Sequence, residues 1–244
     1  MSDAPLIRHL GLAPYEPTWR AMQKFTDERE SSSGDEIWFV EHPAVFTLGM
    51  NASREHVLSP GDIPVVQIDR GGQVTYHGPG QLVVYHLIDL RRRQMGVREL
   101  VVALENAVID YVAELGVTAQ GSRQAPGVYV DGAKLASVGL RIRRGSSYHG
   151  LALNVSVDLA PFERINVCGQ RGLAVTRLAD LVTGLGDAPV GMESIGAAGA
   201  VDTKGAVDAM RGVTQGLTPH LLRQLKFGGD YSAISTALQA VNSR

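Results

Sequence analysis

Cysteine is almost absent from this sequence, because Cys168 is the only one in 244 residues. A lone thiol cannot form an intrachain disulfide, so no disulfide framework holds the fold. No apolar run approaches the ~18–20 residues that a membrane-spanning helix needs. Residues 1–19 also lack the cationic start and apolar block of a signal peptide. We therefore expect a cytoplasmic protein with no membrane partner.

Motifs for metals and nucleotides are missing as well. The sequence has no CxxC, no HExxH and no cluster of His, Asp and Glu at ligand spacing, so we predict no metal site. The stretch DRGGQVTYHGPGQ (69–81) matches neither the phosphate-loop nor the dinucleotide-binding pattern, and we predict no cofactor. The net charge of −2 is ordinary for a globular protein, and no nucleic-acid partner is expected.

What the sequence does contain is a series of short strands and one clear helix. Apolar runs separated by turn residues predict strands at 36–42, at 44–49 and within 65–90. The helix is predicted at 97–116, where leucine and valine recur every three or four residues. Turn signals at 131–132 and 143–147 predict antiparallel strands. Segregated helices and strands favour an α+β fold, and we expect residues 1–182 to form one core.

The C-terminal part differs in composition. A helix is predicted to start at 175–182, and residues 183–216 are rich in glycine and alanine, which is typical of a flexible insertion or linker. Two short amphipathic helices are predicted at 218–227 and 231–242. We expect the segment 217–244 to pack on the core.

The single cysteine lies in the segment RINVCGQRG (164–172), which is polar and contains glycine. Such a loop favours a reactive thiol over a buried apolar one, and Gly169 would leave a backbone N–H near a developing oxyanion. A nucleophilic thiol needs a nearby cation or base. Lys134, one of four lysines, is a candidate if it points into a desolvated site instead of facing water. His77 and His149 are further candidates, although each alone is more typical of a satisfied structural histidine.

Four segments in succession resemble the bacterial octanoyltransferases, also called lipoyl(octanoyl) transferases. They are RGGQVTYHGPGQLVVY (70–85), APGVYVDGAKLASVGLRIRRG (125–145), HGLALNVSVDL (149–159) and FERINVCG (162–169). The resemblance runs from about residue 36 to 182. It departs from the family pattern at Val167, where the family usually has proline.

The resemblance implies a fold like the catalytic domain of biotin and lipoate protein ligases, with a mixed or antiparallel sheet flanked by helices. It implies transfer of an octanoyl or lipoyl group from acyl carrier protein to a lysine of a lipoyl-accepting domain, through a cysteine thioester. The acceptors would be the lipoyl domains of 2-oxoacid dehydrogenases and the glycine cleavage H protein.

The resemblance also assigns residues. The nucleophile falls on Cys168 and its partner lysine on Lys134. The acyl-binding residues fall on three segments: Arg70, Gly71, Gly72, Gln73, Val74, Thr75, Tyr76 and His77; Ser137, Val138 and Gly139; Gly150, Leu151 and Ala152. The arginines at 91–93 and 141–144 are either solvated strand ends or docking residues for an acidic carrier protein.

Several other functions remain open at this point. An ATP-dependent lipoate or biotin ligase would share the fold but would not need an acylated cysteine. An amidotransferase that moves the acyl group between two lipoyl domains would use the same cysteine. A cysteine hydrolase, or a binding module that holds acylated carrier protein without turnover, would also fit parts of the pattern.

Overall fold

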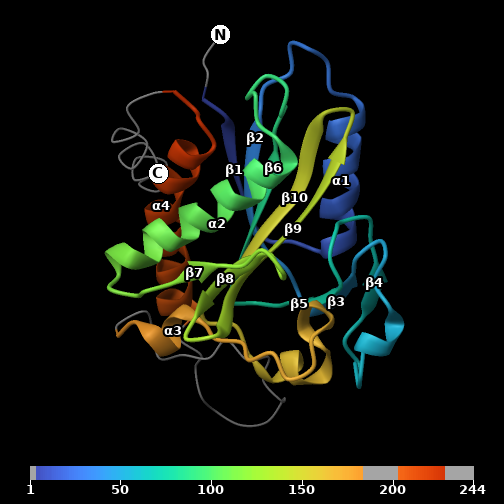
Figure 1. Cartoon of the computed structure of the whole chain (residues 1–244), viewed down its shortest axis with the longest axis vertical. Helices are drawn as coiled ribbons and strands as arrows, with labels where there is room; N and C mark the ends of the chain where they lie inside the picture. Colours follow the sequence, from blue (N-terminus) through green and yellow to red (C-terminus); the bar gives the residue numbers. More distant parts are fainter. Residues whose placement is uncertain (1–3, 184–202, 229–244) are drawn as a thin grey trace.

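A seven-stranded sheet forms the centre of the molecule in the computed structural model, which describes residues 4–183 and 203–228. The strand order is β1-β2-β6-β10-β9-β8-β7 (Figure 1). The strand bounds, in that order, are Leu6–Leu12, Glu36–Glu41, Gln81–Leu87, Ser146–Asn154, Ala133–Arg143, Gly127–Val130 and Gln120–Gly121. β1 pairs with β2 in parallel and the other neighbours are antiparallel. The predicted mixed sheet of an α+β fold is therefore confirmed.

The central strands feed two apolar layers because successive side chains of a strand face opposite sides. Leu82 and Val84 of β6 join the larger apolar cluster, whereas Val83 and Tyr85 join a second cluster beneath helix α1 (Tyr15–Asp27). All seven residues of β6 are buried. Both faces of the sheet are thus covered, and apolar burial of about 25 cal/mol per Å² supplies the main driving force.

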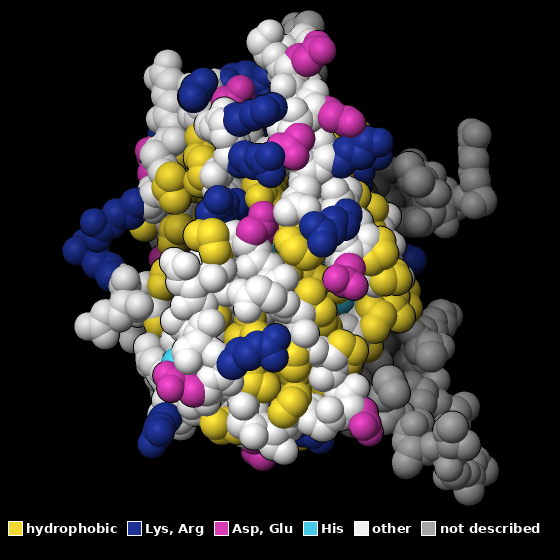
Figure 2. Space-filling view, turned by 90° about the vertical axis from the view of Figure 1, so that its right-hand side faces the viewer, with side chains coloured by type: hydrophobic (Ala, Val, Ile, Leu, Met, Phe, Trp, Pro, Cys, Tyr) yellow, Lys and Arg dark blue, Asp and Glu magenta, His cyan; other side chains and the backbone are white. Residues whose placement is uncertain are grey.

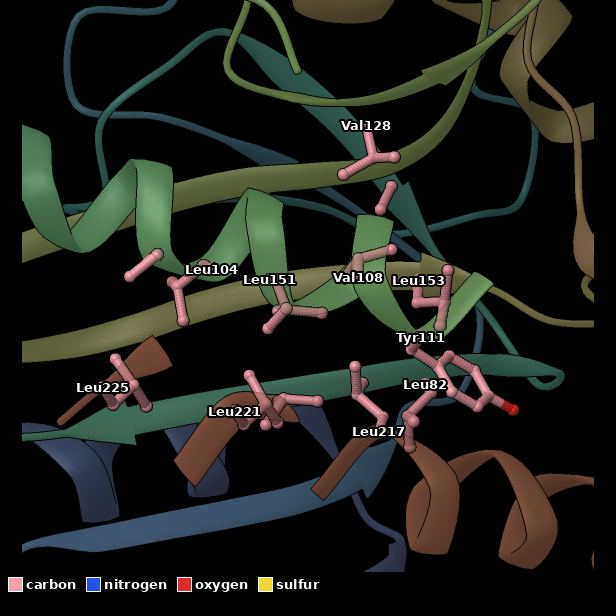
Figure 3. Packing of buried hydrophobic residues seen from close by; sticks show 14 of the residues in the cluster. Leu82, Leu104, Val108, Tyr111, Val128, Leu151, Leu153, Leu217, Leu221 and Leu225 are labelled. Atoms are coloured by element: carbon pink, nitrogen blue, oxygen red, sulfur yellow. The ribbon is translucent and has the colours of Figure 1, made fainter. Parts of the chain in front are cut away.

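Helices α2 (Val97–Glu114) and α4 (Thr203–Gln224) cover the first face. Figure 3 shows leucines of α4 packed against α2 and the sheet; the labelled residues are Leu82, Leu104, Val108, Tyr111, Val128, Leu151, Leu153, Leu217, Leu221 and Leu225. The helix predicted at 97–116 is confirmed and stops before Gly116, whose φ of 81° suits glycine. No described helix is both long enough and apolar enough to span a bilayer.

A smaller sheet, in the order β4-β3-β5, lies beside α1 at one end of the large sheet (Figure 1). Its strands are Val65–Gln67, Val45–Leu48 and Val74–His77, and three 3₁₀ turns lie in the same region: Arg54–His56, Ala160–Arg164 and Val167–Gly169. A third apolar cluster joins this sheet to the last two turns through Phe46, Phe162 and Val167. The turn that carries Cys168 is therefore anchored on the small sheet.

The chain ends differ most from the sequence-based expectations. The predicted turns at 131–132 and 143–147 are confirmed, but the helix expected at 175–182 is only α3, Leu178–Leu181. The linker prediction is wrong for residues 203–216, which form the first part of α4. There the apolar Val213 faces α2, so burial outweighs the helix-weakening glycines. The helix predicted at 231–242 and residues 184–202 lie outside the described part.

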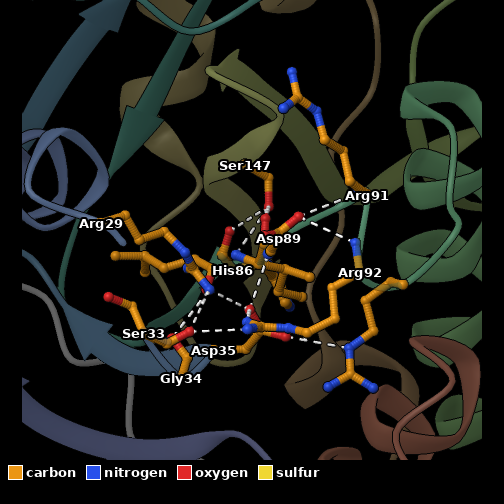
Figure 4. A network of polar contacts seen from close by, with 12 residues as sticks. Arg29, Ser33, Gly34, Asp35, His86, Asp89, Arg91, Arg92 and Ser147 are labelled. Carbon is orange, nitrogen blue, oxygen red and sulfur yellow. Dashed lines mark hydrogen bonds and ion pairs between the residues drawn. The ribbon is translucent and has the colours of Figure 1, made fainter. Parts of the chain in front are cut away.

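Three arginines surround one buried carboxylate, Asp35, which is 4% exposed (Figure 4). Arg92 Nη2 donates to Oδ1 at 2.6 Å, Arg93 Nε donates to Oδ2 at 3.1 Å, and Arg29 also pairs with Oδ1. Arg93 in addition lies 3.9 Å over the ring of Phe227. Arg93 is thus a structural residue that binds Asp35 and packs on Phe227. It is neither a solvated strand end nor an exposed docking residue, the two alternatives expected for the arginines at 91–93.

Candidate active site

Cys168 lies in a strained turn. Its φ of 55° and ψ of 23° put a residue with a side chain in the left-handed region, which costs roughly 1–2 kcal/mol. Gly169 follows with φ of 76°. Val167 is 3% exposed and packs in the third apolar cluster, so packing holds the position where the family usually has proline. The Gly169 N–H donates to Asn166 O at 2.8 Å, so this N–H already has a partner within the turn.

A cavity opens beside Cys168 between the two sheets. It encloses about 500 Å³, counted with the solvent at its open side. Most of the residues predicted to bind the acyl group line it: Arg70, Gly72, Gln73, Val74, Thr75, His77, Ser137, Val138, Gly139, Gly150, Leu151 and Ala152. Tyr15, Val83, Tyr85 and His149 complete the wall together with Cys168. Gly71, Tyr76 and Lys134 are not part of it.

Strand register brings two of the predicted segments together. Gly150 of β10 pairs with Gly139 of β9. The pairing continues with Leu151 opposite Val138 and Ala152 opposite Ser137. A Cβ on Gly150 would lie 2.0 Å from the Val84 carbonyl oxygen, and one on Gly139 would lie 3.1 Å from Arg70 Cδ. Glycine at these positions lets the strands approach closely and leaves room in the cavity.

Arg70 brings a buried positive charge to the cavity wall. It is 8% exposed and donates to carbonyl oxygens and a hydroxyl: to Thr47 O at 2.8 Å, to Thr47 Oγ1 at 2.9 Å and to Gly71 O at 2.9 Å. Burial lowers its pKa, while interaction with Tyr15 and Cys168 opposes that shift. The cavity wall that holds the thiol therefore also holds a guanidinium.

The two candidate histidines differ. His77 has partners at both ring nitrogens, Gln81 Oε1 at 2.7 Å and Thr47 Oγ1 at 3.3 Å, and burial next to His42 lowers its pKa to about 3. It is a satisfied, neutral ring, as the simpler expectation has it. His149 is different, because Nε2 donates to Asp69 Oδ1 at 2.9 Å while Nδ1 has no partner in the described structure.

Asp69 is the carboxylate that holds His149 in the cavity wall. Besides His149 it accepts hydrogen bonds from Trp19 Nε1 at 2.8 Å, from Gln23 Nε2 at 3.1 Å and from the Tyr148 hydroxyl. Burial alone would raise the pKa of Asp69, but these hydrogen bonds lower it well below its usual range. The group therefore stays ionised.

Lys134 is desolvated rather than exposed, with 1% of its surface accessible. Its Nζ donates to Tyr129 Oη at 2.8 Å, to Pro126 O at 3.0 Å and to Ala125 O at 3.2 Å. These three acceptors match the three protons of an ammonium group. The side chain therefore points toward residues 125–129, at the start of β8, and is not part of the cavity wall. The expected Lys134–Cys168 contact is not formed in this conformation.

Backbone contacts nevertheless tie Lys134 to the segment that follows Cys168. The Lys134 N–H donates to Ala174 O at 2.8 Å, and the Thr176 N–H donates to Lys134 O at 3.0 Å. Glu105 of α2 supports the other side, since its Oε1 accepts from the Gly127 N–H at 2.7 Å. Burial raises the pKa of Glu105, and the backbone hydrogen bonds and Lys134 oppose the rise.

A second hollow lies on the other side of the Cys168 turn. This polar cleft measures about 840 Å³, counted like the first with the solvent at its open side, and is lined by Glu55, His56, Leu58, Asn166, Gly169 and Arg171. The segments 56–58 and 164–166 form its floor through backbone hydrogen bonds, among them Asn166 N to His56 O at 2.8 Å. Nothing in the residue pattern around His56 singles it out, because it comes next to Cys168 only through this long-range pairing.

Two other site residues, Tyr15 and Asp69, were also missed by sequence reasoning, because each reaches the site from a distant part of the sequence. Tyr15 enters the cavity from α1, and Asp69 meets His149 across 80 positions of sequence. Within the described residues, no group of three or more His, Cys, Asp or Glu side chains is placed to hold a metal ion.

Comparison with known proteins adds to this geometry. Residues 14–195 match the family model of the lipoyl protein ligase A/B catalytic domain. A protein of Pseudomonas fluorescens named octanoyltransferase is 62% identical over 183 residues, which covers 75% of this chain and 85% of the relative. One of Methylococcus capsulatus with the same name is 61% identical over 176 residues, covering 72% and 85%.

Solved structures share the fold at low sequence identity. Lipoate-protein ligase A bound with ATP superposes with a TM-score of 0.66 at 16% identity, covering 99% of this chain and 94% of the other. A bipartite lipoate protein ligase from Thermoplasma acidophilum gives 0.64 at 15% identity, covering 97% and 91%. At these identities the likeness confirms the expected ligase-like fold.

Proposed function

The chain belongs to the lipoyl protein ligase A/B catalytic-domain family, among its octanoyltransferases, and from this premise we propose that it transfers octanoyl from acyl carrier protein to a lipoyl-accepting domain through Cys168. The protein is an acyltransferase that acts in protein lipoylation. The proposal adds three details to this activity: acyl carrier protein as the donor, a thioester on Cys168 as the intermediate, and the identity of the acceptor domains.

The observation that carries the proposal is the position of the thiol. Cys168 is half-buried and lies at the edge of a cavity whose wall combines glycine, valine, leucine and alanine with polar and aromatic side chains. Such a cavity suits an extended alkyl chain. An acyl group bonded to Sγ could therefore place its chain inside the protein while its carbonyl carbon stays at the open edge.

The first half-reaction exchanges one thioester for another. The Cys168 thiolate attacks the carbonyl carbon of the donor, the new C–Sγ bond forms, and the carrier leaves as a thiolate. Arg70 in the cavity wall is the positive charge that would favour a thiolate at Cys168. Lys134 would add to it only if its Nζ left Tyr129 and the carbonyls of residues 125 and 126. The free-energy change is close to zero because both sides of the exchange are thioesters.

The second half-reaction forms an amide. The amine of an acceptor lysine attacks the Cys168 thioester and expels Sγ, which is downhill without a nucleotide. We propose the lipoyl domains of 2-oxoacid dehydrogenases and the glycine cleavage H protein as acceptors. Acidic partners would meet the surface around α1 and the end of β9 at residues 141–144, where Lys and Arg gather, with Asp and Glu among them, on the upper half of the face shown in Figure 2.

Steady-state octanoylation of an apo lipoyl domain tests the proposal. With octanoyl-acyl carrier protein and no ATP, we expect a mass increase of one octanoyl group on the acceptor. Product that forms only from free octanoate and ATP would establish a ligase instead. In a parallel assay, an octanoylated lipoyl domain replaces the carrier protein as the donor. Faster transfer from the lipoyl domain than from the carrier protein would identify an amidotransferase.

A further inference from the structure

The segment 174–176, which follows the Cys168 turn, runs beside the backbone of Lys134. Two backbone hydrogen bonds, of 2.8 and 3.0 Å, pair Lys134 with this segment in the parallel direction. Residues 170–172, between the turn and the segment, are exposed, so apolar burial does not hold this part of the path. A group that fixes the segment on the sheet therefore also fixes the backbone of Lys134 relative to that of Cys168.

A buried amide of the sheet binds this segment. Asn154, the last residue of β10, is 4% exposed, and its Nδ2 donates to Thr176 O at 2.9 Å. Its Oδ1 accepts from Gln81 Nε2 at 2.9 Å. Gln81 is the first residue of β6, pairs with Asn154 across the two strands and is also buried. Both amides are thus held by the central strands, and neither lines the acyl cavity.

The hydrogen bonds continue from Gln81 to the cavity wall. Gln81 Oε1 lies 2.7 Å from Nδ1 of His77, whose Nε2 lies 3.3 Å from Thr47 Oγ1. That hydroxyl accepts from Arg70 Nη2 at 2.9 Å. Because a guanidinium can only donate, the Thr47 hydroxyl is free to donate its own proton to His77 Nε2. The neutral ring of His77 then carries its proton on Nδ1 and donates to Gln81.

Every bond in this chain points the same way, from the Arg70 guanidinium in the cavity wall to Thr176 O beside Lys134. The guanidinium only donates and the carbonyl oxygen only accepts, so the direction is fixed at both ends. In the interior of a protein, hydrogen bonds in such a chain polarise and strengthen one another. A side chain without an amide at position 154 would release Thr176 O and leave one N–H of Gln81 without its acceptor.

We propose that Asn154 is a positioning residue for the reaction. By binding Thr176 O, it holds the segment that sets the backbone of Lys134 relative to the Cys168 turn. The inference rests on the proposed function, in which Cys168 carries the acyl group. Lys134 Nζ has to leave Tyr129 to reach the turn, and a fixed backbone defines where that movement ends. A misplacement of about 1 Å at a reacting group can cost about 10²-fold in rate.

Single-turnover loading from octanoyl-acyl carrier protein, followed by intact mass, tests this role. Asn154→Leu should lower the rate constant at saturating carrier about 10-fold or more, because Lys134 is no longer held in place. The carrier concentration that gives half the maximal rate should stay within about twofold, since Asn154 does not line the cavity. Asn106→Leu, on α2, is the matched substitution outside the chain of hydrogen bonds and should change neither value.

A double-mutant cycle with Lys134 separates positioning from a general loss of stability. In the Lys134→Met background, Asn154→Leu should change the loading rate by no more than about twofold, because a residue that acts through Lys134 then has nothing left to position. Asn154→Ser, whose side chain is too short to bridge Gln81 and Thr176 O, replaces Asn154→Leu if the latter does not fold.

Two outcomes would overturn the inference and leave the proposed function intact. One is an unchanged loading rate in the folded Asn154 variant, and the other is a pair of losses that multiply in the double variant. A wild-type protein that never loads would overturn the proposed function itself, and this inference with it.

Discussion

Mild acid should destabilise this protein at a pH where most carboxylates are still ionised, because three histidines are buried as neutral rings. His42 and His86 are 0% exposed and His77 is 6% exposed. Burial lowers the pKa of His42 to about 4 and those of His77 and His86 to about 3. In the unfolded chain each ring has a pKa near 6.5.

The sign follows from proton binding. Between about pH 6.5 and 4 the unfolded chain binds protons at these three positions and the folded protein does not, so the free energy of unfolding falls as the pH falls. From pH 7.5 to 5.5 each histidine removes about 1.4 kcal/mol, and the three together remove about 4 kcal/mol. That is a large part of the 5–15 kcal/mol stability typical of a domain.

Urea unfolding followed by tryptophan fluorescence at the two pH values measures the loss. Burial raises the pKa values of Glu41 and Glu105, which act in the opposite direction, so a variant is needed to isolate one ring. His86 is suitable because neither ring nitrogen has a partner in the described structure. His86→Leu should reduce the pH-dependent loss by about 1.4 kcal/mol. An identical loss in wild type and variant would refute the reasoning.

Three further substitutions test the site and its support. Gly139→Ala should lower kcat/KM for octanoyl carrier about 10-fold or more, because its methyl group enters the acyl cavity; an unchanged kcat/KM would contradict the assignment. Lys134→Met should lower kcat about 10²-fold and slow alkylation of Cys168 by iodoacetamide at pH 7; unchanged alkylation would remove the lysine from thiolate stabilisation. Asp35→Ala should cost about 3–5 kcal/mol in urea unfolding, since it leaves its three arginine partners without their carboxylate; a loss under about 1 kcal/mol would show that water replaces the carboxylate.

The elements that follow from local pattern were the ones the sequence could predict. The helix at 97–116 repeats its apolar residues every three or four positions, and Asp131-Gly132 is a turn pair that closes β8 and β9. Helix α1 was missed although Tyr15, Trp19 and Met22 have helical spacing. β1 was missed because its pattern is mostly exposed and its parallel pairing with β2 is not local.

The residues of the candidate site also differ in how far local sequence pattern could predict them. The cavity-lining residues could be assigned because they lie in contiguous motifs that the family resemblance covers. The direction of the Lys134 side chain could not, because it depends on the carbonyls of residues 125 and 126, which Glu105 supports through Gly127. The cleft histidine, His56, meets the Cys168 turn only through a long-range backbone ladder. Spatial neighbours without a local signal require the fold.

The intact mass of the protein after mixing with octanoyl-acyl carrier protein tests the central claim most directly. The account predicts one octanoyl adduct on the wild type, none on Cys168→Ala, and loss of the adduct when an apo lipoyl domain is added. A folded wild-type protein that gains no adduct from intact donor, or a Cys168→Ala variant that gains the same adduct, would contradict it.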